Sequence, residues 1–245
     1  MPPDAPPRTG VLVTRPEPGL ADTMAAVERL GWQAHAMPAL RIEPIMDAVL
    51  PLARTQAVLL TSGQAIAALA GRVRPDMPIL AVGAVTARRM RDAGFTDVTV
   101  AAGTAADLAD LARDRLDPGA GSLLVPTAPT YGQDLAVALR RAGFRVSRRC
   151  VYRVRPAGAP DAAVRTALAG GVIDAALFYS AETARQFLRH LPAGGHAALR
   201  NIRAIAISKS TEAALSTATW RAIQVAARPD QAAILDRLGR RPAGE

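Results

Sequence analysis

Hydroxyl side chains recur in this sequence at places where a helix is expected to begin. They are Thr61, Ser62 and Thr86 in the first half of the chain, and Ser180 and Thr211 in the second. The amides of a first helical turn attract an anion, and a hydroxyl there can cap them. Capping alone explains each residue singly. The recurrence of Ser62 as Ser180 and of Thr86 as Thr211 favours a shared surface for an anionic ligand.

The chain lacks the sequence markers of several common chemistries. His35, His190 and His196 do not stand in a metal-ligand spacing. No G-x-S-x-G elbow, P-loop or G-x-G-x-x-G follows an apolar run, so hydrolases, nucleotidases and dinucleotide-binding enzymes are disfavoured. Cys150 is the single cysteine, has no histidine near it in the sequence and is interpreted as a passive linker thiol. We expect neither a metal nor a cofactor.

The charge balance indicates an anionic partner. The formal net charge is +9, and Lys209 is the only lysine among the basic residues. The arginines are spread along the chain without an aromatic-flanked basic cluster, so a small polyanion is favoured over nucleic acid. A two-domain module that binds a small polyanion without turnover, and a nucleic-acid binder, stay open as alternatives to an enzyme.

The distribution of apolar residues indicates a soluble protein. Half of the residues are apolar, yet no apolar run approaches the roughly 20 residues that span a bilayer. The start, MPPDAPPRTG, has four prolines and no basic region followed by an apolar one, so we interpret it as a loose tail and not as a signal peptide. We therefore expect a cytoplasmic location.

An internal repeat predicts the architecture that positions the hydroxyls. Residues 9–44 (segment A) match residues 121–156 (segment A′) without a gap, at a constant offset of 112. The segments that follow each of them, B and B′, repeat as well, through 57–62 with 175–180, 81–86 with 206–211, and 98–101 with 223–226. If B pairs with A′ in one compact unit, the first A must pair with the last B′.

Short apolar runs alternate with helical stretches, which is typical of a parallel sheet covered on both faces. We expect an α/β protein of two doubly wound, flavodoxin-like domains. The first would be discontinuous, from 9–37 and 157–245, and the second continuous, over 44–147. Residues 38–43 and 148–156 would form a two-stranded antiparallel linker. Ligands of such sheets bind beyond the carboxyl ends of the strands, so two hydroxyl-bearing surfaces would face each other across a cleft.

Five motifs resemble the uroporphyrinogen-III synthase family over about residues 11–238. They are VLVTRP (11–16), LLTSGQA (59–65), AVGAVTA (81–87), VYRV (151–154) and FYSAET (178–183). The family fold has two α/β domains joined by a two-stranded connection, with the first domain built from both chain ends. The resemblance implies a monomeric lyase of haem biosynthesis that needs no metal or cofactor. Its substrate, hydroxymethylbilane, is a polycarboxylate that is cyclised with loss of water and inversion of the last pyrrole ring through a spiro intermediate.

The resemblance also implies roles for single residues. Tyr152 matches the family tyrosine proposed to help the substrate hydroxyl leave. Thr86 and Thr211 match the threonines of a G-x-x-T-A motif, which is whole at 83–87 but reads SKSTE at 208–212, where Lys209 would compensate by pairing with a carboxylate. The expected substrate-binding residues are Arg15, Thr61, Ser62, Gly83, Thr86, Ser180, Lys209 and Thr211. Ser62 is also expected to cap a helix over 63–73.

Overall fold

The computed structural model describes residues 8–242. The proline-rich start, residues 1–7, and residues 243–245 of the expected first domain lie outside the described residues. Contacts within the chain group it into two units, which are unit 1 (Met1–Arg41 and Arg155–Glu245) and unit 2 (Ile42–Val154). The exact placement of the domain boundaries, over 9–37 and 157–245 and over 44–147, stays a prediction.

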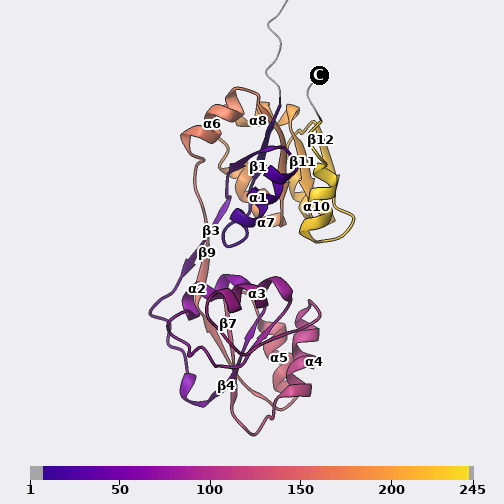
Figure 1. Cartoon of the computed structure of the whole chain (residues 1–245). Coiled ribbons are helices and arrows are strands. Elements are labelled where there is room, and N and C mark those ends of the chain that lie inside the picture. The colour runs from indigo at the N-terminus through magenta and orange to yellow at the C-terminus, as the bar shows by residue number, and fades with distance from the viewer. Residues whose placement is uncertain (1–7, 243–245) are drawn as a thin grey trace, which may run out of the picture. The chain divides into compact units, whose positions relative to one another are not determined.

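The sheet of unit 1 has five parallel strands in the order β12-β11-β10-β1-β2, of which Figure 1 labels β1, β11 and β12. The strands are β1 (Gly10–Val13), β2 (Gln33–Ala36), β10 (Ile173–Phe178), β11 (Arg203–Ala206) and β12 (Ala222–Val225). Every residue of β1 and β10 is buried, as expected for central strands covered on both faces. The helices are α1 (Leu20–Arg29), α6 (Ala162–Ala169), α7 (Ala181–Arg189), α8 (Gly195–Ala198), η3 (Leu199–Asn201), α9 (Lys209–Leu215) and α10 (Gln231–Leu238).

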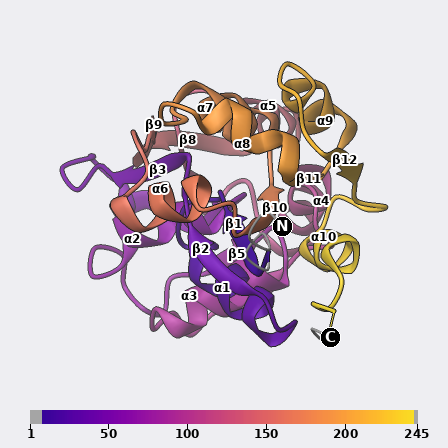
Figure 2. The same ribbon diagram turned by 90° about the horizontal axis from the view of Figure 1, so that it is seen from above.

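Alternation along β1 divides the core of unit 1 into two layers. Leu12 packs with Phe187 of α7, whereas Val13 packs with Val27 of α1 and Ile234 of α10. Successive side chains of a strand point to opposite faces, so one apolar run supplies both cores. Figure 2 shows α7 and α1 on opposite sides of β1.

The sheet of unit 2 has five parallel strands in the order β6-β5-β4-β7-β8. They are β4 (Thr55–Leu60), β5 (Ile79–Ala81), β6 (Val98–Val100), β7 (Ser122–Thr127) and β8 (Arg145–Cys150). Its helices are η1 (Leu52–Arg54), η2 (Gly63–Ala65), α2 (Ile66–Leu69), α3 (Ala84–Asp92), α4 (Ala105–Arg115) and α5 (Gln133–Arg141). Along β4, Leu60 packs with Met90 of α3, and Leu59 packs with Leu108 of α4.

The pairing predicted from the repeat is confirmed. In each sheet the first strand of an A segment lies beside the first strand of a B segment, since β1 pairs with β10 and β7 pairs with β4. The first A therefore joins the last B′, and the middle B joins A′. The predicted fold class, two doubly wound sheets with the first unit built from both ends of the chain, is confirmed as well.

The two crossings of the chain form a two-stranded sheet of β3 (Leu40–Pro44) and β9 (Tyr152–Pro156). The amide of Ala157 donates to the Ala39 carbonyl (3.0 Å), and the amide of Ile45 donates to the Val151 carbonyl (2.8 Å). One residue number rises as the other falls between these two bonds, so the strands are antiparallel.

The helix expected over 63–73 is shorter than predicted. A 3-10 turn, η2, comes first, and α2 ends at Leu69. Gly71 follows with φ +71°, a left-handed conformation that glycine adopts without strain and that ends a helix. Among residues 8–242, no helix is long and apolar enough to cross a membrane.

Candidate functional site

The carboxyl edge of the unit 2 sheet carries four of the predicted site residues. Thr61 and Ser62 follow β4, and Gly83 and Thr86 follow β5, the neighbouring parallel strand. Ser62 begins η2, and its Oγ accepts a hydrogen bond from the amide of Gln64 (3.3 Å). Because parallel strands end at one edge, the hydroxyls and the start of α3 lie together there.

Like α1 and α5, helix α3 begins without a side-chain cap. Gly83 is its N-cap and gives the helix no side-chain hydrogen bond, while Thr86 is buried in the first turn. A Cβ at Gly83 would have only the Cα of Gly103 as a near neighbour, at 3.9 Å. The backbone at Gly83 is therefore approachable, as the G-x-x-T-A motif predicts for a ligand-binding turn.

Tyr152, the predicted acid, lies in the core of unit 2. Its side chain is 4% exposed and packs with Ala128 and Val151. Burial raises the pKa of the Tyr152 phenol, the neighbouring Tyr131 phenol raises it further, and hydrogen bonds with the Ser62 side chain and the Ala128 backbone lower it only in part. The phenol therefore keeps its proton at neutral pH and is held beside Ser62.

Two residues beside Tyr152 are not among the expected site residues. Thr127 ends β7, is buried, and its Oγ1 has no hydrogen-bond partner among the described residues. Tyr131 follows on the loop before α5 and is 58% exposed. The repeat aligns Thr127 with Arg15 and Tyr131 with Gly19. The two copies therefore differ in residue type at both positions, and this difference is the sequence signal that could have identified them.

Arg15 lies at the carboxyl edge of the unit 1 sheet, and several contacts fix its side chain. Its guanidinium carbon lies 4.3 Å from the centre of the Tyr179 ring. Its Nη1 donates to Gln231 Oε1 (3.0 Å) and to Thr23 Oγ1 (3.4 Å). Burial raises the pKa of the Tyr179 phenol, and Thr23 and Arg15 offset this in part. Stacking and hydrogen bonding thus fix the direction of the Arg15 fork.

The remaining predicted residues of unit 1 form ordinary caps. Ser180 accepts a hydrogen bond from the amide of Thr183 (3.1 Å) at the start of α7. Ser208 accepts one from the amide of Thr211 (3.4 Å), and its Oγ lies 3.1 Å from the Thr211 hydroxyl, which is fully buried. Lys209 is exposed and pairs with Glu212 (3.0 Å). In the second copy of the motif, Ser208 therefore caps the helix with its own side chain, at the position where the first copy has Gly83 and no side-chain cap.

The histidines show no metal-binding arrangement. Burial lowers the pKa of His35, and the negative charge of Asp161 offsets this in part. His190 Nδ1 lies 2.9 Å from the Gln186 carbonyl. In the part of the chain that the structure describes, no three His, Cys, Asp or Glu side chains lie close enough together to hold a metal ion.

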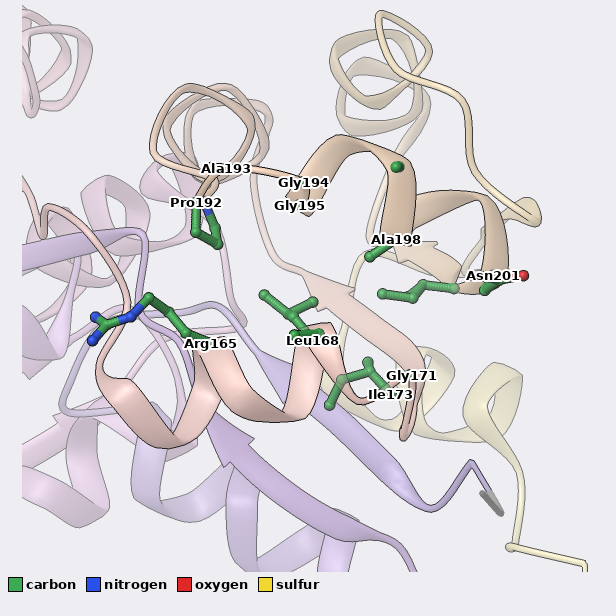
Figure 3. Close-up of a pocket in the computed structure, with 13 residues that line it drawn as sticks. Arg165, Leu168, Gly171, Ile173, Pro192, Ala193, Gly194, Gly195, Ala198 and Asn201 are labelled. Carbon is green, nitrogen blue, oxygen red and sulfur yellow. The ribbon is translucent and has the colours of Figure 1, made fainter. Parts of the chain in front are cut away.

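A cavity of about 670 Å³ lies elsewhere in unit 1 (Figure 3). It is lined mainly by small and apolar residues of α6, the 192–194 turn and α8, with Asn201 of η3, and Arg165 is its charged residue. Ile173, the first residue of β10, also lines it, so the cavity lies at the amino end of that strand. It is thus remote from the carboxyl edge, and none of the predicted site residues lines it.

The sequence of the chain matches the family model described as Uroporphyrinogen-III synthase HemD over residues 21–236. The chain belongs to the uroporphyrinogen-III synthase family. It is therefore a cyclising lyase of haem biosynthesis, and the activity of the family is the closure of hydroxymethylbilane to uroporphyrinogen III. The resemblance found in the five motifs is confirmed.

A solved structure agrees with this membership at the level of the fold. Uroporphyrinogen-III synthetase from Helicobacter pylori 26695 is 15% identical, with a TM-score of 0.59, over 94% of this chain and 97% of that one. A mutant uroporphyrinogen III synthase from Thermus thermophilus is 20% identical, with a TM-score of 0.45, over the same shares. Another Thermus thermophilus uroporphyrinogen III synthase structure is 20% identical, with a TM-score of 0.38, over 93% and 97%. A comparison with curated proteins found no match.

Proposed function

We propose that this uroporphyrinogen-III synthase closes hydroxymethylbilane with Tyr152 as the acid that releases the hydroxyl group. The C–O bond of the hydroxymethyl group breaks, its electron pair leaves with the oxygen, and the Tyr152 proton joins that oxygen to make water. The pyrrole ring is left as an azafulvenium cation, and the substituted carbon of the last ring attacks it to form the spiro intermediate. The bond from that carbon to its original bridge then breaks, and the bridge bonds instead to the free α-carbon of the same ring, which inverts the ring. A pyrrole proton is lost on aromatisation, and the Tyr152 phenolate can take it up.

One observation carries this assignment. Tyr152 is almost fully buried, its pKa is raised, and its oxygen is held beside Ser62 at the carboxyl edge of the sheet. A phenol that stays protonated in a site of low water content is a suitable general acid for a poor leaving group. Its counterpart in segment A is Leu40, which has no proton to give.

Residues of each unit would bind substrate carboxylates. In unit 2 we propose Thr61, Ser62 and Thr86, together with the approachable backbone at Gly83, as hydrogen-bond donors. In unit 1 we propose the fixed fork of Arg15 as a bidentate carboxylate ligand.

Ser180, Lys209 and Thr211 would play lesser parts in binding. Lys209 is exposed and would attract the polyanion while it stays paired with Glu212. Ser180 and Thr211 take part in capping hydrogen bonds, so we propose that they act mainly by shaping the helix starts. We also propose a monomer that acts in the cytoplasm without a metal, a cofactor or a nucleic-acid partner.

The deciding experiment is isomer analysis of the product. Hydroxymethylbilane closes unaided to the symmetrical type I isomer, so the purified chain must both accelerate closure and redirect it to type III. We expect type III to dominate, with the rate unchanged by a metal chelator. A chain that binds the substrate and yields only type I would instead be the non-catalytic polyanion-binding module. Sedimentation of the same sample tests the monomer.

A further inference from the structure

Tyr131 is an unusual aromatic residue in this chain. The sequence has four phenylalanines, two tryptophans and three tyrosines, all of them within the described residues. Tyr131 is 58% exposed, whereas all the others are buried or half-buried. The ring face of Tyr131 is therefore the aromatic surface most open to a ligand among the described residues.

The backbone of Tyr131 is held firmly although its ring is exposed. The amide of Tyr131 donates to the Ala128 carbonyl (3.2 Å) in a turn. The Nη1 of Arg148, on β8, donates to the carbonyls of Pro129 (2.9 Å) and Tyr131 (3.1 Å). Gly132, with φ +74°, then starts α5. Since the loop is anchored on both sides, the ring would lose little conformational entropy when a ligand packs on it.

Tyr131 stands next to the proposed acid. The Val151 amide donates to the Thr127 carbonyl (2.9 Å), which holds the start of β9 beside the start of this loop. Tyr152 packs on Ala128, the residue whose carbonyl the Tyr131 amide contacts. The repeat aligns Tyr152 with Leu40 and Tyr131 with Gly19, so both phenols are additions to one copy of a shared framework.

We propose that the ring face of Tyr131 stabilises the positive charge that develops on the reacting pyrrole when Tyr152 releases water. This rests on the proposed function, and it adds a second catalytic residue to the same step. Loss of water leaves a cationic ring, and the negative face of an aromatic side chain attracts a cation within about 6 Å. No bond to Tyr131 forms or breaks, so its hydroxyl is not needed.

The carboxyl edge of the unit 2 sheet also carries exposed apolar side chains. Val85 at the start of α3 and Val100 at the end of β6 are exposed, at 54% and 39%, and they lie at the same carboxyl edge. They belong to the helix start after β5 and to β6, two and three strands away from β7, and would contact a different part of a large flat ligand.

The test compares three variants by steady-state kinetics, counting only the type III product. Tyr131→Phe keeps the ring and should hold kcat within about twofold of the wild type, whereas Tyr131→Leu should lower kcat about tenfold, the size of a partly desolvated cation–π contact. Val137→Ala changes another exposed apolar residue of unit 2, on α5, and should leave kcat unchanged. An equal loss in the Phe and Leu variants, or a raised KM with unchanged kcat in the Leu variant, would overturn the proposal.

A graded measurement separates charge stabilisation from simple packing. Phenylalanines with increasing numbers of ring fluorines, placed at position 131, keep the shape and weaken the negative face. Turnover should fall with each fluorine, and a flat series would overturn the proposal. A wild type that yields only type I would reject the proposed function itself. A normal wild type, with full activity in Tyr131→Leu, would reject this inference alone.

Discussion

Removal of the Tyr152 hydroxyl is the sharpest test of the proposed mechanism. Tyr152→Phe keeps the ring that packs in the core of unit 2, and the side chain is only 4% exposed, so the substitution opens little space. It removes the proton that the leaving hydroxyl would take. It also removes the oxygen that Ser62 and the Ala128 backbone contact. Activity and stability should therefore respond by different amounts.

The two magnitudes follow from the burial and the contacts. Loss of one positioned general acid lowers the rate by roughly 10²-fold. Loss of a net hydrogen bond costs about 0.5–1.5 kcal/mol. A loss of about 1 kcal/mol lowers the Tm by about 2–8 °C across the usual range of domain sizes. We thus expect a large fall in kcat, with a small fall in Tm, and the residual product should stay mostly type III because substrate folding depends on other residues.

The assay measures the rate of hydroxymethylbilane closure in a single turnover and the isomer of the product. The Tm of the same sample is measured by thermal unfolding. Tyr179→Phe is a matched control, since it removes a hydroxyl from another largely buried tyrosine and keeps the ring under Arg15. It should leave kcat within a few-fold and change the Tm little, because the Tyr179 hydroxyl has no hydrogen-bond partner among the described residues. Full activity of Tyr152→Phe would remove Tyr152 from the mechanism. An equal loss of activity in both variants would show that the effect is not specific to the Tyr152 proton.

The pH profile of activity tests the role of Tyr152 independently. Burial and the Tyr131 phenol raise the pKa of Tyr152 above its ordinary value of 10.0. The acid is needed in its protonated form, so activity should show no alkaline decline from Tyr152 between neutral pH and about 9. A decline near neutral pH that disappears in Tyr152→Phe would contradict this reasoning.

Three further predictions concern stability. Burial of Asp174 raises its pKa, but hydrogen bonds from Arg221 and Arg203 outweigh this and lower it overall. Asp174→Asn should therefore lower the free energy of unfolding by about 1.5–3 kcal/mol at pH 7, measured with denaturant. The difference should shrink at low pH, where the wild-type carboxyl is protonated. The pKa of His35 lies below 6.5 in the folded state, so stability should fall as pH drops below 6.5, and His35→Gln should show a smaller fall. A fragment of residues 42–154 should unfold cooperatively by calorimetry, whereas 155–245 alone should not, because it lacks β1 and β2; a sharp transition in the latter would contradict the discontinuous unit.

The sequence was sufficient for the topology because the repeat carries register as well as order. In unit 2 Ala57 pairs with Leu123, and in unit 1 Ala175 pairs with Val11. Residues 11 and 123 differ by 112 and residues 57 and 175 by 118, which are the offsets at which these segments match in the sequence. Strand pairing follows buried apolar runs, and these runs are what the repeat preserves.

The surroundings of the site could be predicted only in part. Residues at strand ends, such as Ser62 and Thr86, follow from periodicity and lie where expected. Tyr131 does not, because the loop over 128–132 has no periodicity, and its position beside Tyr152 depends on hydrogen bonds from Val151 and Arg148. The short α2 was missed for a similar local reason, the left-handed turn at Gly71.

The departures from the repeat indicate how the proposed chemistry would be divided between the units. Unit 2 has Tyr152, Tyr131 and Gly83, where unit 1 has Leu40, Gly19 and Ser208. Unit 1 has Arg15 where unit 2 has Thr127, whose hydroxyl is buried without a partner among the described residues.

A proton donor and a neutral aromatic face favour the formation of a cation, whereas an arginine beside the reacting carbon would oppose it. Positive charge is more useful at the distant carboxylates, where it holds the substrate without acting on the pyrrole. The duplicated framework thus permits unit 2 to release water with neutral groups, while the charged ligand for a carboxylate comes from unit 1. Arg15→Gln should accordingly raise KM more than it lowers kcat, the reverse of Tyr152→Phe, and equal effects on kcat in the two variants would contradict this division.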